Sequence, residues 1–72
     1  MRGNFIYKKI GKRLAIERER KRMSQERVAM ISEMDRTYLA RIEAGKANPS
    51  LKILSKISKV LSIKLFSLFK EI

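Results

Sequence analysis

Helix-capping residues stand at intervals along a chain that has few helix breakers, and this pattern restricts the fold more than any other feature. A serine or aspartate side chain can accept a hydrogen bond from a free amide at a helix start. Such residues precede apolar-periodic segments at Ser24, Asp35, Ser50 and Ser62. The chain has one proline and three glycines. It has no internal repeat, and apolar and polar residues nowhere alternate over the length of a β-strand. The pattern therefore predicts five helices joined by short breaks, which make a compact all-α domain.

The boundaries of the expected helices follow from these caps and from apolar residues at helical spacing. Gly45 stands where the end of the third helix favours a residue that tolerates a positive φ angle. The helices are expected to cover residues 5–22, 25–32, 36–44, 51–61 and 63–70. Their inward-facing residues are expected to be Ile6, Ile10 and Leu14, then Val28 and Ile31, then Leu39 and Ile42, and then Leu51, Leu54, Ile57 and Leu61.

The small size of the chain limits what can stabilise its fold. Its 72 residues make one domain, residues 1–72, and a chain of this size buries only about 60% of its unfolded surface. It contains no cysteine and no histidine, which excludes disulfides and zinc sites of the usual ligand types. Stability must therefore come from helix packing, to which a partner subunit can add.

The sequence contains neither a transmembrane segment nor a secretory signal. A transmembrane helix needs about 18 or more consecutive apolar residues, and no such run is present. The start, MRGNFIYKKIGKR, is basic but lacks the apolar region and the cleavage site of a secretory signal. We therefore expect a cytoplasmic protein, and the lack of cysteine agrees with a reducing compartment.

The net charge indicates a polyanionic partner. Lys and Arg number 18 against 7 Asp and Glu, which leaves a net charge of +11 and a pI near 10.6. Nucleic acid and an anionic membrane surface are both partners of this kind, and basic side chains can also simply keep a small protein soluble. The lysine-rich apolar tail, residues 51–72, leaves an amphipathic segment on an anionic membrane as an alternative.

The third expected helix would have one apolar side and one basic side. With Arg36 placed at ~0°, Thr37 lies at ~100° and Arg41 at ~140°. Leu39 and Ile42 lie at ~300° and ~240°, on the opposite side of the helix. An ordinary amphipathic helix with a solvated polar face would show the same division, so this pattern alone does not indicate a binding site.

The short helix just before it changes this interpretation. Two short helices joined by a tight turn form a helix-turn-helix, whose second helix enters the major groove while its first crosses the DNA backbone. Arginine there can bond guanine O6 and N7, and threonine can offer a hydroxyl group or contact a thymine methyl group. The outer face of the third helix is therefore a candidate for reading base pairs.

The segment SQERVAMISEMDRTYLARIEAGKANPSLKILSKISKVL resembles the Cro- and phage-repressor-type helix-turn-helix family, also called the xenobiotic-response-element family. The matching residues, over roughly residues 8–70, are Ile10-Gly11, Leu14, Arg18, Ser24-Gln25-Glu26, Val28-Ala29, Tyr38-Leu39, Ile42-Glu43, Gly45 and Pro49-Ser50-Leu51. The resemblance implies a five-helix, lambda-repressor-like domain with the helix-turn-helix at about residues 24–45 and a helical dimerisation segment at about residues 50–72. Within it, DRTYLARIE is similar to the recognition helix of restriction–modification controller proteins.

The resemblance also implies roles for individual side chains. The residues implied to read bases are Arg36, Thr37 and Arg41. The residues implied to contact DNA phosphates are Gln25, Tyr38, Lys46 and Asn48, and the position of Gln25 also allows it to touch the third helix. Arg18 and Glu43 would form a partly buried ion pair between the first and third helices. The sequence departs from the family at Arg22 and Glu33, where glycine is common, and at Glu17, where an apolar residue is usual.

The C-terminal segment contains more apolar residues than one short helix can bury, namely Ile63, Leu65, Phe66, Leu68, Phe69 and Ile72. Monomeric proteins seldom expose a large contiguous apolar patch. The family resemblance implies a homodimer formed by the last two helices, with Leu65, Phe66 and Phe69 at the interface. The alternative is that the two phenylalanines close the core of a monomer.

Together these features imply a sequence-specific transcriptional regulator, a repressor or a controller, that binds an inverted-repeat operator in double-stranded DNA as a homodimer. No histidine or cysteine is available for catalysis, and no glycine-rich phosphate loop is present, so we expect no enzymatic activity. We expect no cofactor, no metal site, no small-molecule ligand and no membrane partner. A restriction–modification controller, a phage-type repressor and an antitoxin-type partner-binding module remain open alternatives.

Overall fold

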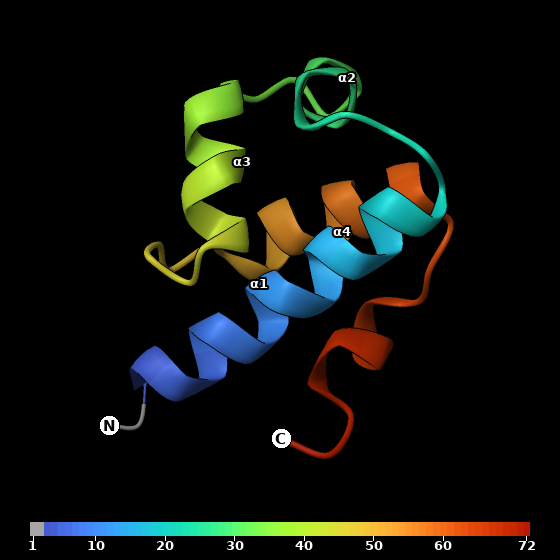
Figure 1. Cartoon of the computed structure of the whole chain (residues 1–72). Coiled ribbons are helices and arrows are strands. Elements are labelled where there is room, and N and C mark those ends of the chain that lie inside the picture. Colours follow the sequence, from blue (N-terminus) through green and yellow to red (C-terminus); the bar gives the residue numbers. More distant parts are fainter. Residues whose placement is uncertain (1–2) are drawn as a thin grey trace.

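The computed structural model describes residues 3–72 as a bundle of helices (Figure 1). In chain order these are α1 (Gly3–Arg20), α2 (Gln25–Ile31), α3 (Arg36–Glu43), α4 (Leu51–Leu61) and the short 3-10 helix η1 (Leu65–Phe69). The described residues contain no strand, so the expected all-α class is confirmed. Among these residues, no helix combines the length and the apolar character needed to cross a membrane.

The expected count of five α-helices is wrong, because the last segment is a single stretch of 3-10 helix. Ser62 does not cap the start of this segment; it ends α4 in a left-handed conformation, with φ 58° and ψ 39°. The chain then runs on to Lys64, which is extended and makes no side-chain capping bond. Without a capping side chain, only a tight helix of 5 residues forms at Leu65–Phe69.

The starts of the other helices follow the serine caps. The Oγ atom of Ser24 accepts a hydrogen bond from the backbone N–H of Arg27, and that of Ser50 accepts one from Ile53. Asp35 also stands at an N-cap position, but its side chain makes no capping bond in this structure. The expected limits of α4 are confirmed, whereas α1 begins and ends two residues earlier than expected.

All four α-helices end in the same way, with a left-handed residue followed by an N–H that reaches back five residues. The left-handed residues are Arg22, Glu33, Gly45 and Ser62, with φ angles of 58°, 59°, 75° and 58°. The returning bonds run from Met23 to Arg18, from Met34 to Ala29, from Lys46 to Arg41 and from Ile63 to Ser58, at 2.8–3.1 Å. This is the Schellman arrangement, which glycine favours. The positions where the family commonly has glycine therefore keep a left-handed backbone here with Arg22 and Glu33.

The core lies where the four α-helices and η1 meet, and its buried residues are Ile10, Leu14, Val28, Ala29, Leu39, Ile42, Leu54, Ile57, Leu61 and Leu68. Three residues that we expected inside are exposed: Ile6 at 37%, Ile31 at 46% and Leu51 at 64%. The helices α1 and α4 carry Ile6 and Leu51 near their N-terminal ends, beyond the centre of the packing.

The exposure of Ile31 has a geometric cause. In α2 the buried residues are Val28 and Ala29, with Ser32 just after the helix. With Val28 at ~0°, Ala29 lies at ~100° and Ser32 at ~40°, so the buried side is centred between them. Ile31 lies at ~300°, about 100° away from this centre. Ala29 therefore takes the inward place that we expected for Ile31.

A close crossing between α1 and α3 positions the helix-turn-helix. At Gly11 a Cβ atom would come within 2.8 Å of the Glu43 carbonyl oxygen and would also meet the Ile42 carbonyl oxygen. At Gly45 a Cβ would meet the Cα of Lys8 at 2.7 Å, and φ is positive there. Neither position can hold a side chain unless the backbone of α1 or of α3 moves. The C-terminal end of α3 is therefore held directly against α1.

Candidate nucleic-acid interface

The helices α2 and α3 are joined by a tight turn at one end of the molecule, whereas η1 lies at the other end (Figure 1). The turn contains the left-handed Glu33, and its N–H donates to the Met30 carbonyl oxygen at 3.1 Å. Met34 follows and packs against the core, which anchors the turn from inside. This short connection fixes the direction of α3 relative to α2, as a helix-turn-helix requires.

The two sides of α3 differ as the sequence predicts. Leu39 and Ile42 are fully buried, with exposed fractions of 0% and 1%. Arg36, Thr37 and Arg41 are exposed on the outer side. Tyr38 is half-buried and packs against the core. The α3–α4 loop carries the exposed Lys46 and Asn48 next to the C-terminal end of α3. The structure thus exposes the expected base-reading residues on the outer face of α3, with the expected loop residues beside its C-terminal end.

An ion pair joins α1 to α3 beneath this face. Arg18 Nε lies 2.7 Å from Glu43 Oε2, and Arg18 Nη2 donates to Glu43 Oε1 at 3.1 Å. The two side chains are only 13% and 7% exposed. The hydrogen bond to Glu43 raises the pKa of Arg18 above its ordinary value, against the opposing effect of burial. Arg18 Nη1 also donates to the Met23 carbonyl oxygen at 2.7 Å, so the pair holds the α1–α2 connection as well.

Gln25 connects this ion pair to the outer face of α3. Its Nε2 donates to Glu43 Oε1 at 2.8 Å. Its Oε1 accepts a hydrogen bond from Arg36 Nη1 at 3.3 Å. Because a carboxylate can only accept, Glu43 orients the Gln25 amide with its nitrogen inward and its oxygen toward Arg36. Arg36, the first residue of α3, is thus held by a chain of side-chain hydrogen bonds that starts at Arg18.

Sequence reasoning missed a second role for Arg41. Its Nη2 donates to the Lys46 carbonyl oxygen at 2.8 Å, so in this structure the guanidinium group holds the α3–α4 loop. No sequence signal identifies this bond, because α3 ends at Glu43 and the Lys46 carbonyl oxygen belongs to the loop that follows. Arg41 can therefore read a base only by leaving this bond or by using its remaining donors.

The residues assigned to the dimer interface lie away from α2 and α3, on η1 (Figure 1). Phe66 is 61% exposed and Phe69 is 38% exposed, while Leu65 is half-buried. The neighbouring Leu68 is buried in the core at 1%. Phe69 also borders a small apolar hollow of about 120 Å³, whose other lining residues are Ile6, Tyr7, Ile10, Ile42, Pro49, Leu51 and Leu54.

The residues that the structure describes contain no group of three or more His, Cys, Asp or Glu side chains that could hold a metal ion. The face around α3 instead offers arginine, threonine, glutamine, lysine and asparagine side chains. These groups are hydrogen-bond donors suited to phosphate oxygens and to the acceptor edges of bases.

Comparisons with known proteins agree with a helix-turn-helix at α2 and α3. The family model described as helix-turn-helix matches residues 14–68. The control protein C.MunI of a Mycoplasma species is 43% identical over 70 residues, which cover 96% of this chain and 95% of that protein. The transcriptional regulator SlrR of Bacillus subtilis is 38% identical over 61 residues, which cover 83% of this chain and 40% of that regulator.

A solved structure agrees with these sequence matches. The crystal structure of the restriction–modification controller protein C.AhdI from Aeromonas hydrophila superposes with a TM-score of 0.84 at 38% identity. The match covers 88% of this chain and 96% of that one. The likeness therefore extends over nearly the whole length of a small protein.

Proposed function

Because this chain belongs to the helix-turn-helix family of DNA-binding regulators, we propose that it is a sequence-specific transcriptional regulator that binds an inverted-repeat operator as a homodimer. One observation carries this proposal more than any other. The outer face of α3 presents Arg36, Thr37 and Arg41, while its inner face is fixed in the core by Leu39 and Ile42. A helix held in this way can enter a major groove as a rigid unit.

In this proposal Arg36, Thr37 and Arg41 read base edges, and Arg36 is the main specificity residue. Gln25, Tyr38, Lys46 and Asn48 contact phosphates on either side of the groove. Gln25 already bonds Glu43 and Arg36, which leaves one amide N–H for a phosphate oxygen. Tyr38 is half-buried, and in this proposal it contacts a phosphate through its hydroxyl group.

The homodimer is supported by the exposed phenylalanines of η1 and by the short reach of a single α3. A recognition helix of 8 residues covers only a few base pairs, and two-fold pairing doubles the length of DNA that is read. Symmetry then requires inverted half-sites. The centres of these half-sites are expected about 34–36 Å apart, so that both α3 helices enter one side of the duplex.

We further propose that the regulated genes belong to a restriction–modification system. The support is the full-length similarity to the control protein C.MunI and to the restriction–modification controller C.AhdI. The match to SlrR covers less than half of that regulator. The similarity over nearly the full length of two controller proteins is what supports the controller among the alternatives that the sequence alone leaves open.

The test of base reading is the substitution Arg36→Ala, compared by selection from a random DNA pool. Loss of one bidentate contact to guanine is expected to cost about 1–3 kcal/mol and to relax the preference at one position of each half-site. The matched control is Lys46→Ala, which should weaken binding to all sequences alike. If wild type and Arg36→Ala selected the same motif with the same strength, Arg36 would not read a base.

A further inference from the structure

The 3-10 helix η1 carries the proposed dimer interface, but it has little support of its own. Lys64 provides no capping side chain at its start, and Lys70 is extended at its end, with φ −63° and ψ 129°. Within it the N–H of Ser67 donates to the Lys64 carbonyl oxygen at 3.0 Å. The carbonyl groups of the last turn of a helix have no partners within that helix. The orientation of η1 therefore depends on contacts with the rest of the molecule.

Residues three apart lie on the same side of a 3-10 helix, because it has about three residues per turn. Leu65 and Leu68 thus share one side, which faces inward with Leu68 buried. Phe66 and Phe69 share another side, and both are exposed. Any rotation of η1 about its axis would change where the two phenylalanines point, although Leu68 could remain near the core.

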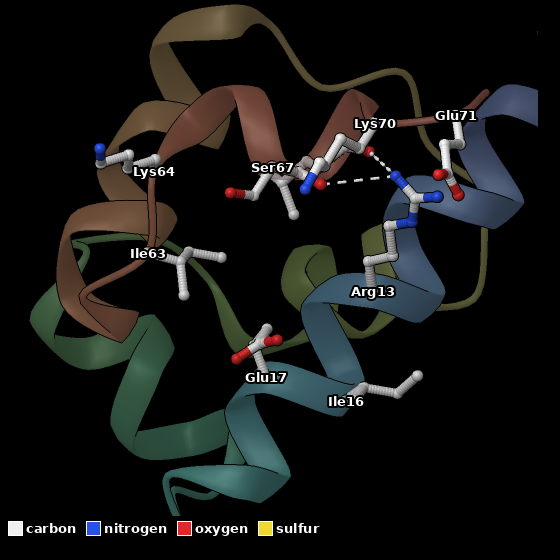
Figure 2. A pocket seen from close by; sticks show the side chains of 9 residues that line it. Arg13, Ile16, Glu17, Ile63, Lys64, Ser67, Lys70 and Glu71 are labelled. Carbon is white, nitrogen blue, oxygen red and sulfur yellow. Dashed lines mark hydrogen bonds between the residues drawn. The ribbon is translucent and has the colours of Figure 1, made fainter.

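Arg13 of α1 holds the end of η1 from outside. Figure 2 shows its guanidinium group reaching across to the η1 backbone. Its Nη1 donates to the Leu68 carbonyl oxygen at 3.0 Å and to the Ser67 carbonyl oxygen at 3.4 Å. Hydrogen bonds from a charged donor are stronger than those between neutral groups. They also satisfy carbonyl groups that the short helix leaves without partners.

Beside these bonds the contact between α1 and η1 is open. A hollow of about 430 Å³ separates the two elements, with Ile16, Glu17 and Ile63 on its walls (Figure 2). Part of the α1 side of η1 is therefore open to this hollow, although Leu68, which also lines the hollow, stays buried. The inward side of η1, with Leu65 and Leu68 on the core, and Arg13 at the carbonyl groups therefore attach η1 separately.

We propose that Arg13 is a positioning residue for self-association: it fixes the rotation of η1 so that Phe66 and Phe69 face the second copy of the chain. The inference rests on the homodimer of the proposed function and adds a residue outside its interface. Arg13 lies on a different element from the phenylalanines and is 54 and 55 residues away in sequence from its two acceptors. Its loss would leave η1 attached only through the apolar side that carries Leu65 and Leu68.

The experiment compares Arg13→Met with wild type in the full chain. Methionine keeps much of the aliphatic stem and removes every donor. The dissociation constant of the dimer, measured by sedimentation equilibrium, is expected to rise about 10-fold. Binding of a single DNA half-site by the monomer should stay unchanged, while affinity for the full operator falls. Arg13→Lys keeps one charged donor group and should recover part of the loss.

The effect of charge on dimerisation has to be separated from the effect of the lost hydrogen bonds, since Arg13→Met also removes one positive charge from a strongly basic chain. Lower repulsion between two copies would strengthen the dimer, which is opposite to the expected effect. Lys12→Met is the matched control, because Lys12 is the exposed neighbour on α1, whereas Arg13 is the donor to both carbonyl oxygens of η1. This variant should dimerise at least as well as wild type.

The outcomes distinguish this inference from the proposed function. A wild-type chain that is monomeric at micromolar concentration would refute the homodimer, and the role of Arg13 with it. A dimeric wild type whose dissociation constant is the same after Arg13→Met would overturn the inference alone. If Arg13→Met lost half-site binding and thermal stability in step with dimerisation, Arg13 would serve general folding, which would also overturn the inference.

Discussion

At the scale of single residues, the side-chain bonds beneath α3 explain how one arginine can be held ready for a base. Arg36 bonds Gln25, Gln25 bonds Glu43, and Glu43 bonds Arg18. A long side chain loses rotamer freedom when it binds, and a side chain that is already held loses less. The chain of bonds should therefore favour the one orientation of Arg36 that fits its base.

Gln25→Met tests this explanation, because methionine keeps the length of glutamine and removes both hydrogen bonds. The ratio of affinities for the operator and for an operator altered at the Arg36 base pair should fall. A double-mutant cycle with Arg36→Ala should show a coupling energy of about 0.5–3 kcal/mol. Asn48→Ala is the control, since it removes a proposed phosphate contact and should not couple. Additive effects of Gln25→Met and Arg36→Ala would mean that Gln25 does not orient Arg36.

Contacts of this kind could be predicted only in part from the sequence. The pairing of Arg18 with Glu43 follows from the family resemblance, and the exposure of Arg36 and Thr37 follows from the helical period. The resemblance also allows Gln25 to touch α3, but neither source identifies Glu43 as its acceptor or gives the bond from Arg41 to the Lys46 carbonyl oxygen. They depend on which rotamer each long side chain adopts once the helices have packed. Periodicity carries no information about that choice.

At the scale of elements, the sequence predicts where most helices start better than it predicts which of their residues face the core. Ser24 and Ser50 mark the starts of α2 and α4 because their capping bonds are local. The expected fifth α-helix fails because Ser62 fits the end of α4 as well as the start of a new helix. Ala29 is buried and Ile31 is exposed because of the side on which α2 packs against its neighbours. Only the tertiary structure determines that side.

The shared form of the helix ends leads to a prediction for α1 and α2. Arg22 and Glu33 adopt φ angles of 58° and 59°, which cost a non-glycine residue on the order of 1 kcal/mol. Arg22→Gly and Glu33→Gly should therefore each raise the free energy of unfolding in urea by about 0.5–1 kcal/mol. Lys12→Gly, in the middle of α1, is the control and should lower it by about 1 kcal/mol. Equal destabilisation by all three glycines would show that residues 22 and 33 carry no strain.

At the scale of the whole molecule, the net charge of +11 should make DNA binding strongly dependent on salt. With about 6–10 phosphates neutralised, the logarithm of the binding constant should fall against the logarithm of salt concentration with a slope of roughly −5 to −9. Titrations of the operator at several salt concentrations measure this slope. A slope near −1, or tighter binding to anionic vesicles than to any duplex, would favour the membrane alternative.

The same measurement can count the copies of the chain on the operator. Each Lys46 that contacts a phosphate adds about 0.9 to the slope, so Lys46→Ala should reduce its magnitude by about 1.8 in a dimer. A single bound copy would lose only half of this. Lys59→Ala is the control, because Lys59 is an exposed lysine near the C-terminal end of α4. The salt dependence of DNA binding by Lys59→Ala should have the same slope as that of wild type.

The last prediction separates the dimer interface from the core within one short element. Phe66 and Phe69 are 61% and 38% exposed, whereas Leu68 between them is 1% exposed. Phe66→Asn and Phe69→Asn should therefore leave the monomer folded and make it the main species in light scattering. Leu68→Asn should instead unfold the chain, because it places an amide in the core at a cost of about 1–3 kcal/mol or more. If the phenylalanine variants unfolded like Leu68→Asn, the two rings would complete a monomer core. If they stayed folded, dimeric and able to bind the full operator, the two copies would have to meet through another surface.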